Sequence, residues 1–301
     1  MQLNPVIQWV GGKTRMAANI TPLFAKIARA SYVEPFGGSG AMFCAKAPED
    51  FEVYNDLNGV LVNLFKALRR MDAQKRFEEL AAVTPHSRAI WYEFRDILRA
   101  RHDGDITKSD ELLNKAGFDG YDKEVVLAFM IFYCQRLGFG GKYNNSFAGG
   151  LNQHSCRAYR NAVDRIGDYT RRFQNVLIEN LDAFDCVAKY DDERTLFYLD
   201  PPYDCQTSDC YLSGWTIADS TRLVETLTNA SASCVLSCYD SDLYETLLGA
   251  GYKKRQFEAF SSVCKTSKGA KFKRLETVYY RLSPYAKAER RAFKARNYLF
   301  Q

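Results

Sequence analysis

The segment Asp200-Pro201-Pro202-Tyr203 directly follows the apolar run 196–199 and combines side chains that could do chemistry. Two consecutive prolines remove two backbone donors and fix φ, so nearby carbonyl groups are presented as acceptors in a stiff geometry. The Asp200 carboxylate and the Pro201 carbonyl could together accept both hydrogens of an exocyclic amine such as adenine N6. This would free the nitrogen lone pair for an electrophile, and the carboxylate would stabilise the developing positive charge.

The aromatic ring of Tyr203 could stack on a base that has left the double helix. An exocyclic amine cannot react inside a stacked duplex, so the base must be extruded at a cost of a few kcal/mol. Stacking on one aromatic side chain contributes roughly 1 to 3 kcal/mol and offsets much of that cost. The alternative interpretation of the tetrapeptide is a plain turn after a strand.

A second candidate site is the glycine-rich segment 34–40, which lies at a predicted junction of strand and helix. Gly37 and Gly40 would let the backbone turn tightly and approach a ligand closely. About twenty residues after Phe36, Asp56 ends the next predicted strand, where an acid can accept hydrogen bonds from ribose hydroxyls. The pairing predicts a nucleoside-containing cofactor; a nicotinamide cofactor and a purely structural turn are the alternatives.

Near the N-terminus, the segment 9–14 offers an aromatic face at Trp9, two glycines and a cation at Lys13. Its Gly-Lys-Thr ending matches the end of a phosphate-binding loop. That loop requires a glycine five residues before Gly12, where this chain has Ile7. A nucleoside triphosphatase is therefore disfavoured, and the structural alternative is a turn followed by a solvated lysine.

The predicted secondary structure is that of an α/β protein with a largely parallel sheet covered on both faces. Apolar runs predict strands over 32–35, 51–56, 175–178, 195–199 and 234–237, and helical periodicity predicts helices over 57–70 and 220–227. The segment 274–282 is expected to be a final strand or hairpin arm, and the basic tail 287–296 a helix.

An inserted, mainly helical domain is predicted over residues 66–159, with helices near 90–101 and 124–137. The sheet domain would then comprise residues 1–65 and 160–301. No apolar run is long enough to span a membrane and no signal-peptide pattern is present, which predicts a cytoplasmic protein. Nine cysteines without a Cys-x-x-Cys pair, and three histidines, indicate free thiols and no metal site.

Taken together, these segments resemble the Dam-type DNA adenine methyltransferases of the D12 class. The matching pieces are residues 9–13, 33–40, 55–58 and 200–203, in the family's order of cofactor segments, recognition domain and Asp-Pro-Pro-Tyr segment. The resemblance implies a Rossmann-like S-adenosylmethionine-dependent methyltransferase sheet with an inserted DNA target-recognition domain. It also implies double-stranded DNA as the substrate and methylation of adenine N6 on a flipped-out base.

The resemblance further assigns roles to particular residues, with a weaker match over 178–184. It implies a catalytic segment made of Asp200, Pro201, Pro202 and Tyr203. It implies cofactor contacts from Trp9, Lys13, Phe36, Gly37, Gly40, Asp56, Asp182, Phe184 and Asp200.

The loop 136–147 stands where this family carries its recognition hairpin. Arg136 and Lys142 could read guanine or bind phosphate, Asn144 could pair with adenine edges, and Tyr143 could wedge into the base stack. The chain lacks the family's Asn-x-Pro-Phe-Gly ending after Asn144, so the target GATC is not predicted. A surface loop without DNA contacts is the alternative.

Several other classes compete with this interpretation. A cytosine C5 methyltransferase needs a nucleophilic thiolate, usually in a Pro-Cys pair, and no proline here is followed by cysteine. An N4-cytosine methyltransferase more often begins the tetrapeptide with serine, so Asp200 favours adenine. A non-catalytic DNA-binding module retaining the cofactor fold is opposed by the intact Gly37, Gly40, Asp56 and Asp200.

The net charge of +5 permits a polyanionic partner without demonstrating one. A basic tail offers more local evidence, because its cations could follow DNA phosphates and make binding depend strongly on salt. A solvated helix face is the alternative for this tail. Its members are Lys287, Arg290, Arg291, Lys294 and Arg296.

Overall fold

A computed structural model describes residues 3–9, 12–139, 146–148, 154–202, 214–265 and 271–298. Four residues with predicted site roles lie outside the described residues: Lys142, Tyr143, Asn144 and Tyr203. No helix in the described part of the chain is long and apolar enough to cross a membrane.

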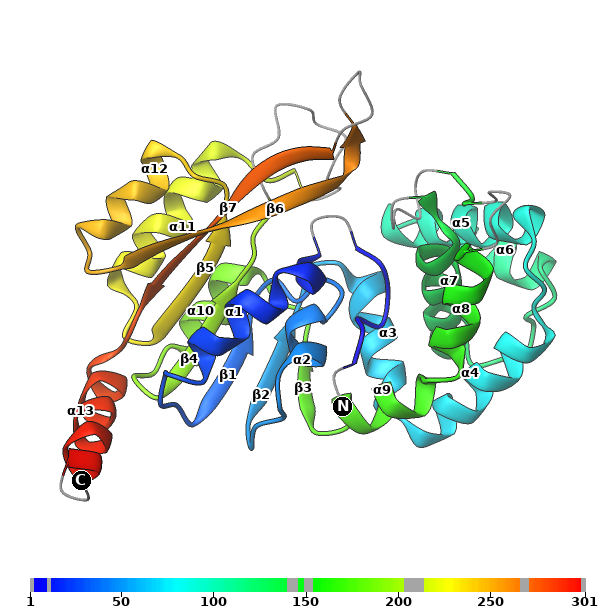
Figure 1. Cartoon of the computed structure of the whole chain (residues 1–301). Coiled ribbons are helices and arrows are strands. Elements are labelled where there is room, and N and C mark those ends of the chain that lie inside the picture. Colours follow the sequence, from blue (N-terminus) through cyan, green and yellow to red (C-terminus); the bar gives the residue numbers. More distant parts are fainter. Residues whose placement is uncertain are drawn as a thin grey trace. The chain divides into compact units, whose positions relative to one another are not determined.

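The central element is a seven-stranded sheet with the strand order β3-β2-β1-β4-β5-β7-β6 (Figure 1). β1 pairs in parallel with β2 and β4, and β4 pairs in parallel with β5, whereas β7 is antiparallel to both β5 and β6. The prediction of an α/β fold with a largely parallel sheet is confirmed. The strands are β1 (Ser31–Glu34), β2 (Glu52–Asn55), β3 (Val176–Glu179), β4 (Thr195–Leu199), β5 (Ser233–Cys238), β6 (Lys253–Lys265) and β7 (Lys271–Arg281).

The predicted helices 57–70, 90–101, 124–137 and 220–227 correspond to α3, α5, α7 and α11, and the predicted helical tail to α13. The helices are α1 (Ala17–Phe24), α2 (Ala41–Ala45), α3 (Gly59–Leu68), α4 (Met71–Val83), α5 (Arg88–His102), α6 (Ile106–Lys115), α7 (Lys123–Leu137), α8 (His154–Val163), α9 (Ile166–Phe173), α10 (Ala183–Tyr190), α11 (Ile217–Asn229), α12 (Asp242–Glu245) and α13 (Pro284–Tyr298).

The chain divides into two compact units. Unit 1 comprises residues 1–14, 38–47 and 56–180, and unit 2 comprises residues 15–37, 48–55 and 181–301. The predicted recognition domain 66–159 lies within unit 1, and its role stays a prediction.

Unit 1 is built around α7, whose side chains from Val125 to Leu137 are all buried. A helix that is apolar on every side must be enclosed by other helices, and α3, α4, α5 and α8 pack against it. Asp122 caps its first turn, because its Oδ1 accepts hydrogen bonds from the backbone N–H groups of Glu124 and Val125.

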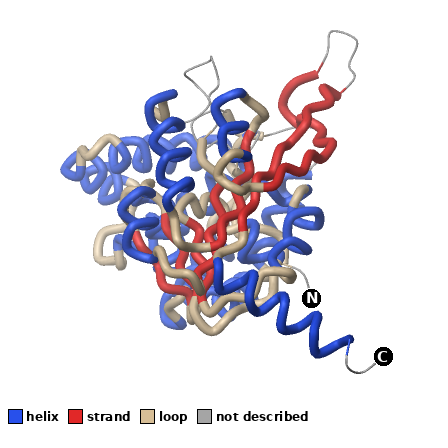
Figure 2. The backbone as a smooth tube through the Cα atoms, turned by 90° about the vertical axis from the view of Figure 1, so that its left-hand side faces the viewer, coloured by secondary structure: helices blue, strands red, loops and turns tan. Residues whose placement is uncertain are grey.

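Unit 2 packs helices on both faces of its strands. Phe24 of α1 contacts the rings of Tyr32 and Tyr198 on one face, and α10 and α11 bury Val187 and Leu223 against the other. The antiparallel β6–β7 hairpin forms the edge of the sheet, and its long arms are visible in Figure 2. The predicted hairpin arm 274–282 is confirmed as β7.

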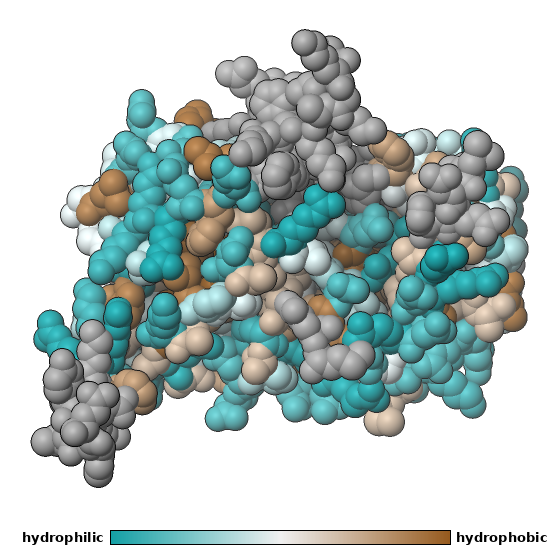
Figure 3. Space-filling model, in the orientation of Figure 1, coloured by the Kyte–Doolittle hydropathy of each residue, from teal (hydrophilic) through white to brown (hydrophobic). Residues whose placement is uncertain are grey.

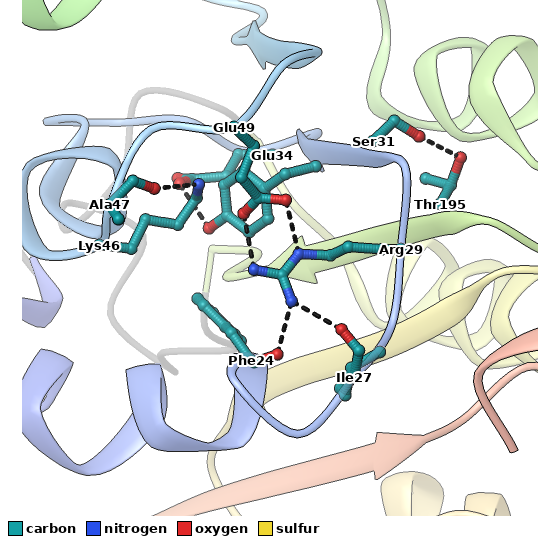
Figure 4. Close-up of polar contacts among 10 residues, drawn as sticks. Phe24, Ile27, Arg29, Ser31, Glu34, Lys46, Ala47, Glu49 and Thr195 are labelled. Carbon is teal, nitrogen blue, oxygen red and sulfur yellow. Dashed lines mark hydrogen bonds and ion pairs between the residues drawn. The ribbon is translucent and has the colours of Figure 1, made fainter. Parts of the chain in front are cut away.

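The beginning of β1 is anchored by Arg29, as Figure 4 shows. Its Nε and Nη2 donate to the two carboxylate oxygens of Glu49, both at 2.7 Å, while Nη1 donates to the carbonyls of Phe24 and Ile27. Paired N–H···O bonds of this fork geometry fix orientation as well as distance. The guanidinium therefore ties the end of α1 to the segment that precedes β2.

Candidate active site

In unit 2, the turn after β1 is held by Asn55, the last residue of β2, which is fully buried. Its Nδ2 donates to the carbonyls of Pro35, at 2.9 Å, and Leu181, at 3.1 Å, while its Oδ1 accepts from the Leu181 N–H at 2.8 Å. The Gly37 N–H donates to the Asn55 carbonyl at 2.7 Å. One amide side chain therefore ties the glycine-rich turn to the segment that leads into α10.

Gly37 stands in this turn because there is no room for a side chain. A Cβ atom at this position would lie 2.3 Å from Cε2 of Tyr54, well inside van der Waals contact. The close contact at Gly37 is thus with the Tyr54 ring of β2, and the approach of this turn to a ligand stays a prediction.

In unit 1, the Asp56 carboxylate is held by two backbone donors. The Gly38 N–H donates to Oδ2 and the Asn58 N–H donates to Oδ1, both at 2.9 Å. Asn180 fixes the same segment, because its Nδ2 donates to the carbonyls of Asp56 and Leu57. Burial raises the pKa of the Asp56 carboxyl, and the hydrogen bonds from Asn58 and Gly38 oppose this shift. The carboxylate is thus oriented at the end of the glycine-rich turn.

Trp9 packs against the same turn of unit 1. A Cβ atom at Gly38 would lie 3.4 Å from Cδ1 of Trp9, and the Gly12 N–H donates to the Trp9 carbonyl at 3.0 Å. Lys13 follows in a short 3₁₀ turn and is buried. The structure therefore brings Trp9 and Asp56 to one turn, through Gly38.

Gly40 precedes α2 in unit 1 with a φ of 65°, and its neighbours leave no space for a side chain. A Cβ atom there would lie 2.9 Å from Cζ of Phe173 and 3.1 Å from Cε1 of Phe65. Gly117 also has a positive φ, 84°, but nothing lies within 4 Å of a Cβ at that position. The two glycines thus share backbone conformation and differ in packing.

We expect Gly40→Ala to destabilise the protein by about 2 to 5 kcal/mol, the sum of left-handed backbone strain and overpacking. Gly117→Ala should cost only the backbone strain, about 1 to 2 kcal/mol. Urea unfolding followed by circular dichroism compares the two variants. Equal losses of stability would show that the Phe65 and Phe173 rings give way, and that Gly40 is required for its φ alone.

In unit 2, Asp200 is the first residue after β4, whose five residues are all buried. The β4–β5 register pairs Leu199 with Leu236, so Asp200 stands at the carboxyl end of β4. The Asp200 side chain is half-buried and Pro201 is buried. Asp200 therefore reaches the carboxyl edge of the sheet from a rigid strand, where its carboxylate can meet a ligand.

Two buried glutamates lie near this edge of unit 2. Glu34 ends β1 and accepts a hydrogen bond from the Tyr32 hydroxyl at 2.7 Å, and Glu276 of β7 accepts one from Ser237 at 3.0 Å. Burial, followed by the charges of Asp200, Glu34 and Glu276, raises the pKa of Tyr198 well above its ordinary value. Glu34 of β1, Glu276 of β7 and Asp200 after β4 therefore all act on the surroundings of the Tyr198 hydroxyl. Their negative charge favours a positively charged group there.

An aromatic cluster in unit 2 brings Phe36 and Phe184 together through Trp215. The Trp215 ring meets Phe36 edge-on at 5.4 Å and stacks on Phe184 at 6.1 Å with an interplanar angle of 12°. The Arg222 guanidinium lies 3.9 Å from the Phe184 ring centroid. Asp182 caps α10, because its Oδ1 accepts from the Phe184 N–H at 2.8 Å.

Neither Trp215 nor Asn55 was singled out from the sequence as a site residue. Trp215 lies shortly after the Asp-Pro-Pro-Tyr segment, but this is a weak signal. A single tryptophan in the sequence does not indicate which aromatic rings it packs against. Asn55 directly precedes Asp56 in a matched motif, and a polar residue ending an apolar strand is the signal that could have identified it.

Arg136 was predicted to contact DNA, but its guanidinium is enclosed within unit 1. Its Nε donates to the Val6 carbonyl at 2.8 Å, and its Nη2 donates to the carbonyls of Pro5 and Val6 at 2.5 Å. Only 8% of the residue is exposed, and burial lowers the pKa of this arginine. Arg136 therefore joins α7 to the N-terminal segment, and this enclosure argues against the predicted DNA contact.

The strand order of unit 2 reverses direction between β1 and β4, since β2 follows β1 on one side and β5 follows β4 on the other. Open α/β sheets bind ligands beyond the carboxyl ends of the strands at such a reversal. A glycine-rich turn after the first strand and an acid after the second are typical of enzymes with nucleoside cofactors. Fold and site thus define a Rossmann-like enzyme of this class.

Comparison with known proteins identifies the family within that class. The chain matches the D12 class N6 adenine-specific DNA methyltransferase family over residues 9–261, and it belongs to that family. The predicted resemblance, fold and enzyme class are confirmed, and the family's adenine specificity decides against an N4-cytosine methyltransferase.

Three similar proteins come from two bacteria and an archaeon. The Type II methyltransferase M1.LlaDCHI of Lactococcus lactis subsp. cremoris is 28% identical over 211 residues, which cover 67% of this chain and 66% of the relative. The Type II methyltransferase M.MjaIII of Methanocaldococcus jannaschii is 26% identical, covering 67% and 70%. The DNA adenine methylase of Haemophilus influenzae is 21% identical, covering 66% and 63%. The matches thus span about two thirds of these relatives.

Proposed function

We propose that this chain transfers a methyl group from S-adenosylmethionine to N6 of an adenine extruded from double-stranded DNA, in the cytoplasm. The observation that carries the proposal is the position of Asp200 at the carboxyl end of β4, beside the reversal of strand order. The family match supports an adenine-specific methyltransferase, and the donor and the state of the base are inferred from the residues.

The residues of the glycine-rich turn suit a nucleoside-containing methyl donor. Each oxygen of the Asp56 carboxylate accepts one backbone N–H and keeps lone pairs that can accept the ribose hydroxyls. Phe36 and Trp215 are half-buried and offer aromatic surface for a purine ring, and the buried Phe184 stacks on Trp215. When bound, S-adenosylmethionine supplies an electrophilic methyl group. The proposed contacts are those implied for the family: Trp9, Lys13, Phe36, Gly37, Gly40, Asp56, Asp182, Phe184 and Asp200.

The catalytic work in this proposal is done by acceptors rather than by a nucleophilic side chain. The Asp200 carboxylate and the Pro201 carbonyl each accept one N6 hydrogen, which frees the nitrogen lone pair. As N6 gains positive charge, the carboxylate stabilises it and then receives the proton that N6 must lose. Pro202 stiffens the segment, and the proposed role of Tyr203 is to stack on the extruded base.

No catalytic metal is part of this proposal. Within the described residues, no group of three or more histidine, cysteine or acidic side chains could hold a metal ion. For DNA recognition we propose Lys142, Tyr143 and Asn144, which are cationic, aromatic and amide side chains of the types that read base edges and phosphates.

Expression in a host without DNA methylation tests the function directly. Nucleosides from that host should contain N6-methyladenine, as detected by mass spectrometry, and sequencing that detects modified bases should place it at one recurring sequence. A host carrying Asp200→Ala is the control and should contain far less N6-methyladenine at the same protein level. The appearance of N4-methylcytosine, or of no modified base with a folded protein present, would refute the proposal.

A further inference from the structure

A basic pocket lies where β7 ends and α13 begins, in unit 2. Its volume is about 230 Å³, and it is open to solvent on one side. Five cations line it and no carboxylate does: Lys253, Arg281, Lys287, Arg290 and Arg291. Because Lys287, Arg290 and Arg291 are spaced three and four residues apart, they lie on one face of α13. Hydrophilic side chains gather beside this end of α13, at the lower left of Figure 3.

One wall of the pocket is rigid. Arg281 donates from Nη1 to the Thr228 carbonyl at 2.9 Å and from Nη2 to the Ala230 carbonyl, and its guanidinium lies over the Tyr252 ring. Ser283 anchors the start of α13, because its hydroxyl donates to the Glu193 carbonyl and accepts from the Ala286 N–H. The Ser283 N–H also donates to the hydroxyl of Ser233 in β5 at 3.0 Å, so the start of the helix that carries three of the cations is fixed to the sheet.

The other four cations have no carboxylate partner within the described part of the chain. Lys253, Lys287, Arg290 and Arg291 are all exposed, and Glu289, also on α13, does not line the pocket. Unpaired cations gathered around one concavity repel each other, and a polyanion relieves that repulsion. Fixed positive charge in a concave surface is the chemistry that binds phosphate groups.

The pocket and Asp200 lie at opposite ends of the parallel strands. Arg281 pairs with Cys234 at the beginning of β5, whereas Leu199 pairs with Leu236, nearer its end. Asp200 thus stands about three residues, or roughly 10 Å, further along the sheet than Arg281. From β7 the chain continues into α13, which lies beyond the amino ends of β4 and β5 (Figure 1). DNA whose target base lies at Asp200 would approach the carboxyl ends of the strands, whereas the pocket lies at their amino ends.

We propose that the pocket binds the phosphate backbone of a second DNA segment, distinct from the segment that carries the target adenine. The inference rests on the proposed function, because DNA is the polyanion that this enzyme meets. Contacts to phosphate are independent of sequence, and such contacts let proteins slide and hop along DNA. The second segment would keep the enzyme on the molecule while the active site is between targets.

The test is a triple substitution, Lys287→Ala with Arg290→Ala and Arg291→Ala, which keeps good helix formers in α13. Sedimentation with a labelled duplex of about 20 base pairs at low salt should show two duplexes bound per wild-type chain and one per variant chain. With plasmid DNA, the slope of log affinity against log salt concentration should be shallower in the variant by about 2.7, which is about 0.9 for each of three lost phosphate contacts.

Two controls keep this result specific. Glu289→Ala changes the same helix without removing a cation, and Lys26→Ala removes an exposed cation elsewhere in unit 2; both should bind two duplexes. A wild-type chain that binds one duplex, or a triple variant that still binds two, overturns the proposal. The methylation rate on saturating plasmid DNA should be unchanged in the triple variant. The methylation rate tests the proposed function separately. A wild-type chain without methylation activity would refute that function, whereas the number of bound duplexes alone decides whether the pocket binds DNA.

Discussion

Asp200→Ala is expected to reduce the rate of methyl transfer by at least about 10² to 10³-fold, the loss typical of removing one preorganised group that stabilises charge in a transition state. The alanine removes both an acceptor for an N6 hydrogen and the negative charge beside the nitrogen. Asp200 follows a fully buried strand and is itself half-buried, so the loss should fall on catalysis with little change in folding.

Asp200→Asn separates the two contributions. An asparagine oxygen can still accept one N6 hydrogen but carries no charge, so this variant should be more active than Asp200→Ala and far less active than wild type. Initial rates with radiolabelled S-adenosylmethionine and unmethylated plasmid DNA measure the series. Glu225→Ala removes an exposed carboxylate of α11 and serves as the control. Near-normal activity of Asp200→Ala would remove Asp200 from the mechanism.

Local sequence patterns were sufficient for the parallel strands. The predicted strand 195–199 coincides with β4, and the predicted strands 32–35 and 234–237 differ from β1 and β5 by one residue at each end. These strands are buried on both faces, so they appear in the sequence as short continuous apolar runs. Their burial by helices makes the signal local, and no knowledge of their partners was needed.

The sequence analysis did not predict β6, because this strand lacks the burial that produces an apolar run. Its first residues are Lys253, Lys254, Arg255 and Gln256, which give no apolar run. β6 pairs only with β7 and ends the sheet, and charged residues are common on such edge strands because they discourage pairing with other chains. An edge strand thus lacks the burial that makes a strand recognisable in the sequence.

The candidate site shows the same distinction between local and distant requirements. Gly37, Asp56 and Asp200 could be singled out from the sequence because backbone turns and acceptor groups require those residue types at those places. Asn55 acts through Leu181, 126 residues away, and nothing near Asn55 in the sequence indicates that contact. The Arg136 guanidinium donates to the carbonyls of Pro5 and Val6, and a cation beside a glycine-rich loop gives no sign of these distant partners in the sequence.

Asp56→Ala is expected to weaken S-adenosylmethionine binding by at least about 100-fold. Hydrogen bonds to a charged group contribute roughly 1.5 to 3 kcal/mol each, and the proposal gives Asp56 two ribose hydroxyls. The variant also leaves the Gly38 and Asn58 N–H groups without their present acceptor. Isothermal titration calorimetry measures the affinity, and Asp119→Ala, an exposed aspartate of the same unit, is the control. Unchanged affinity would place the ribose elsewhere.

Asp56→Asn should not rescue binding, in contrast to the partial activity expected of Asp200→Asn. Each Asp56 oxygen accepts a backbone N–H, and an amide replaces one of these acceptors with a donor. Either Gly38 or Asn58 would then face an N–H group, so the turn must shift. Thermal unfolding of both variants, measured beside the titrations, verifies that they are folded at the assay temperature.

The pH dependence of cofactor affinity provides an independent measure of the same carboxylate. Burial raises the pKa of Asp56, and only the ionised form offers both oxygens as acceptors. Affinity should therefore be constant at high pH and fall with acidification at a higher pH than for an ordinary aspartate. Because the pKa of Asp56 is raised in the folded chain, protonation of this group stabilises the fold, and that stability is lost as pH rises. Acid therefore does not unfold the chain through Asp56. Weaker binding in acid would report the loss of the charged acceptor. If Asp56→Ala shows the same pH profile, another group is responsible.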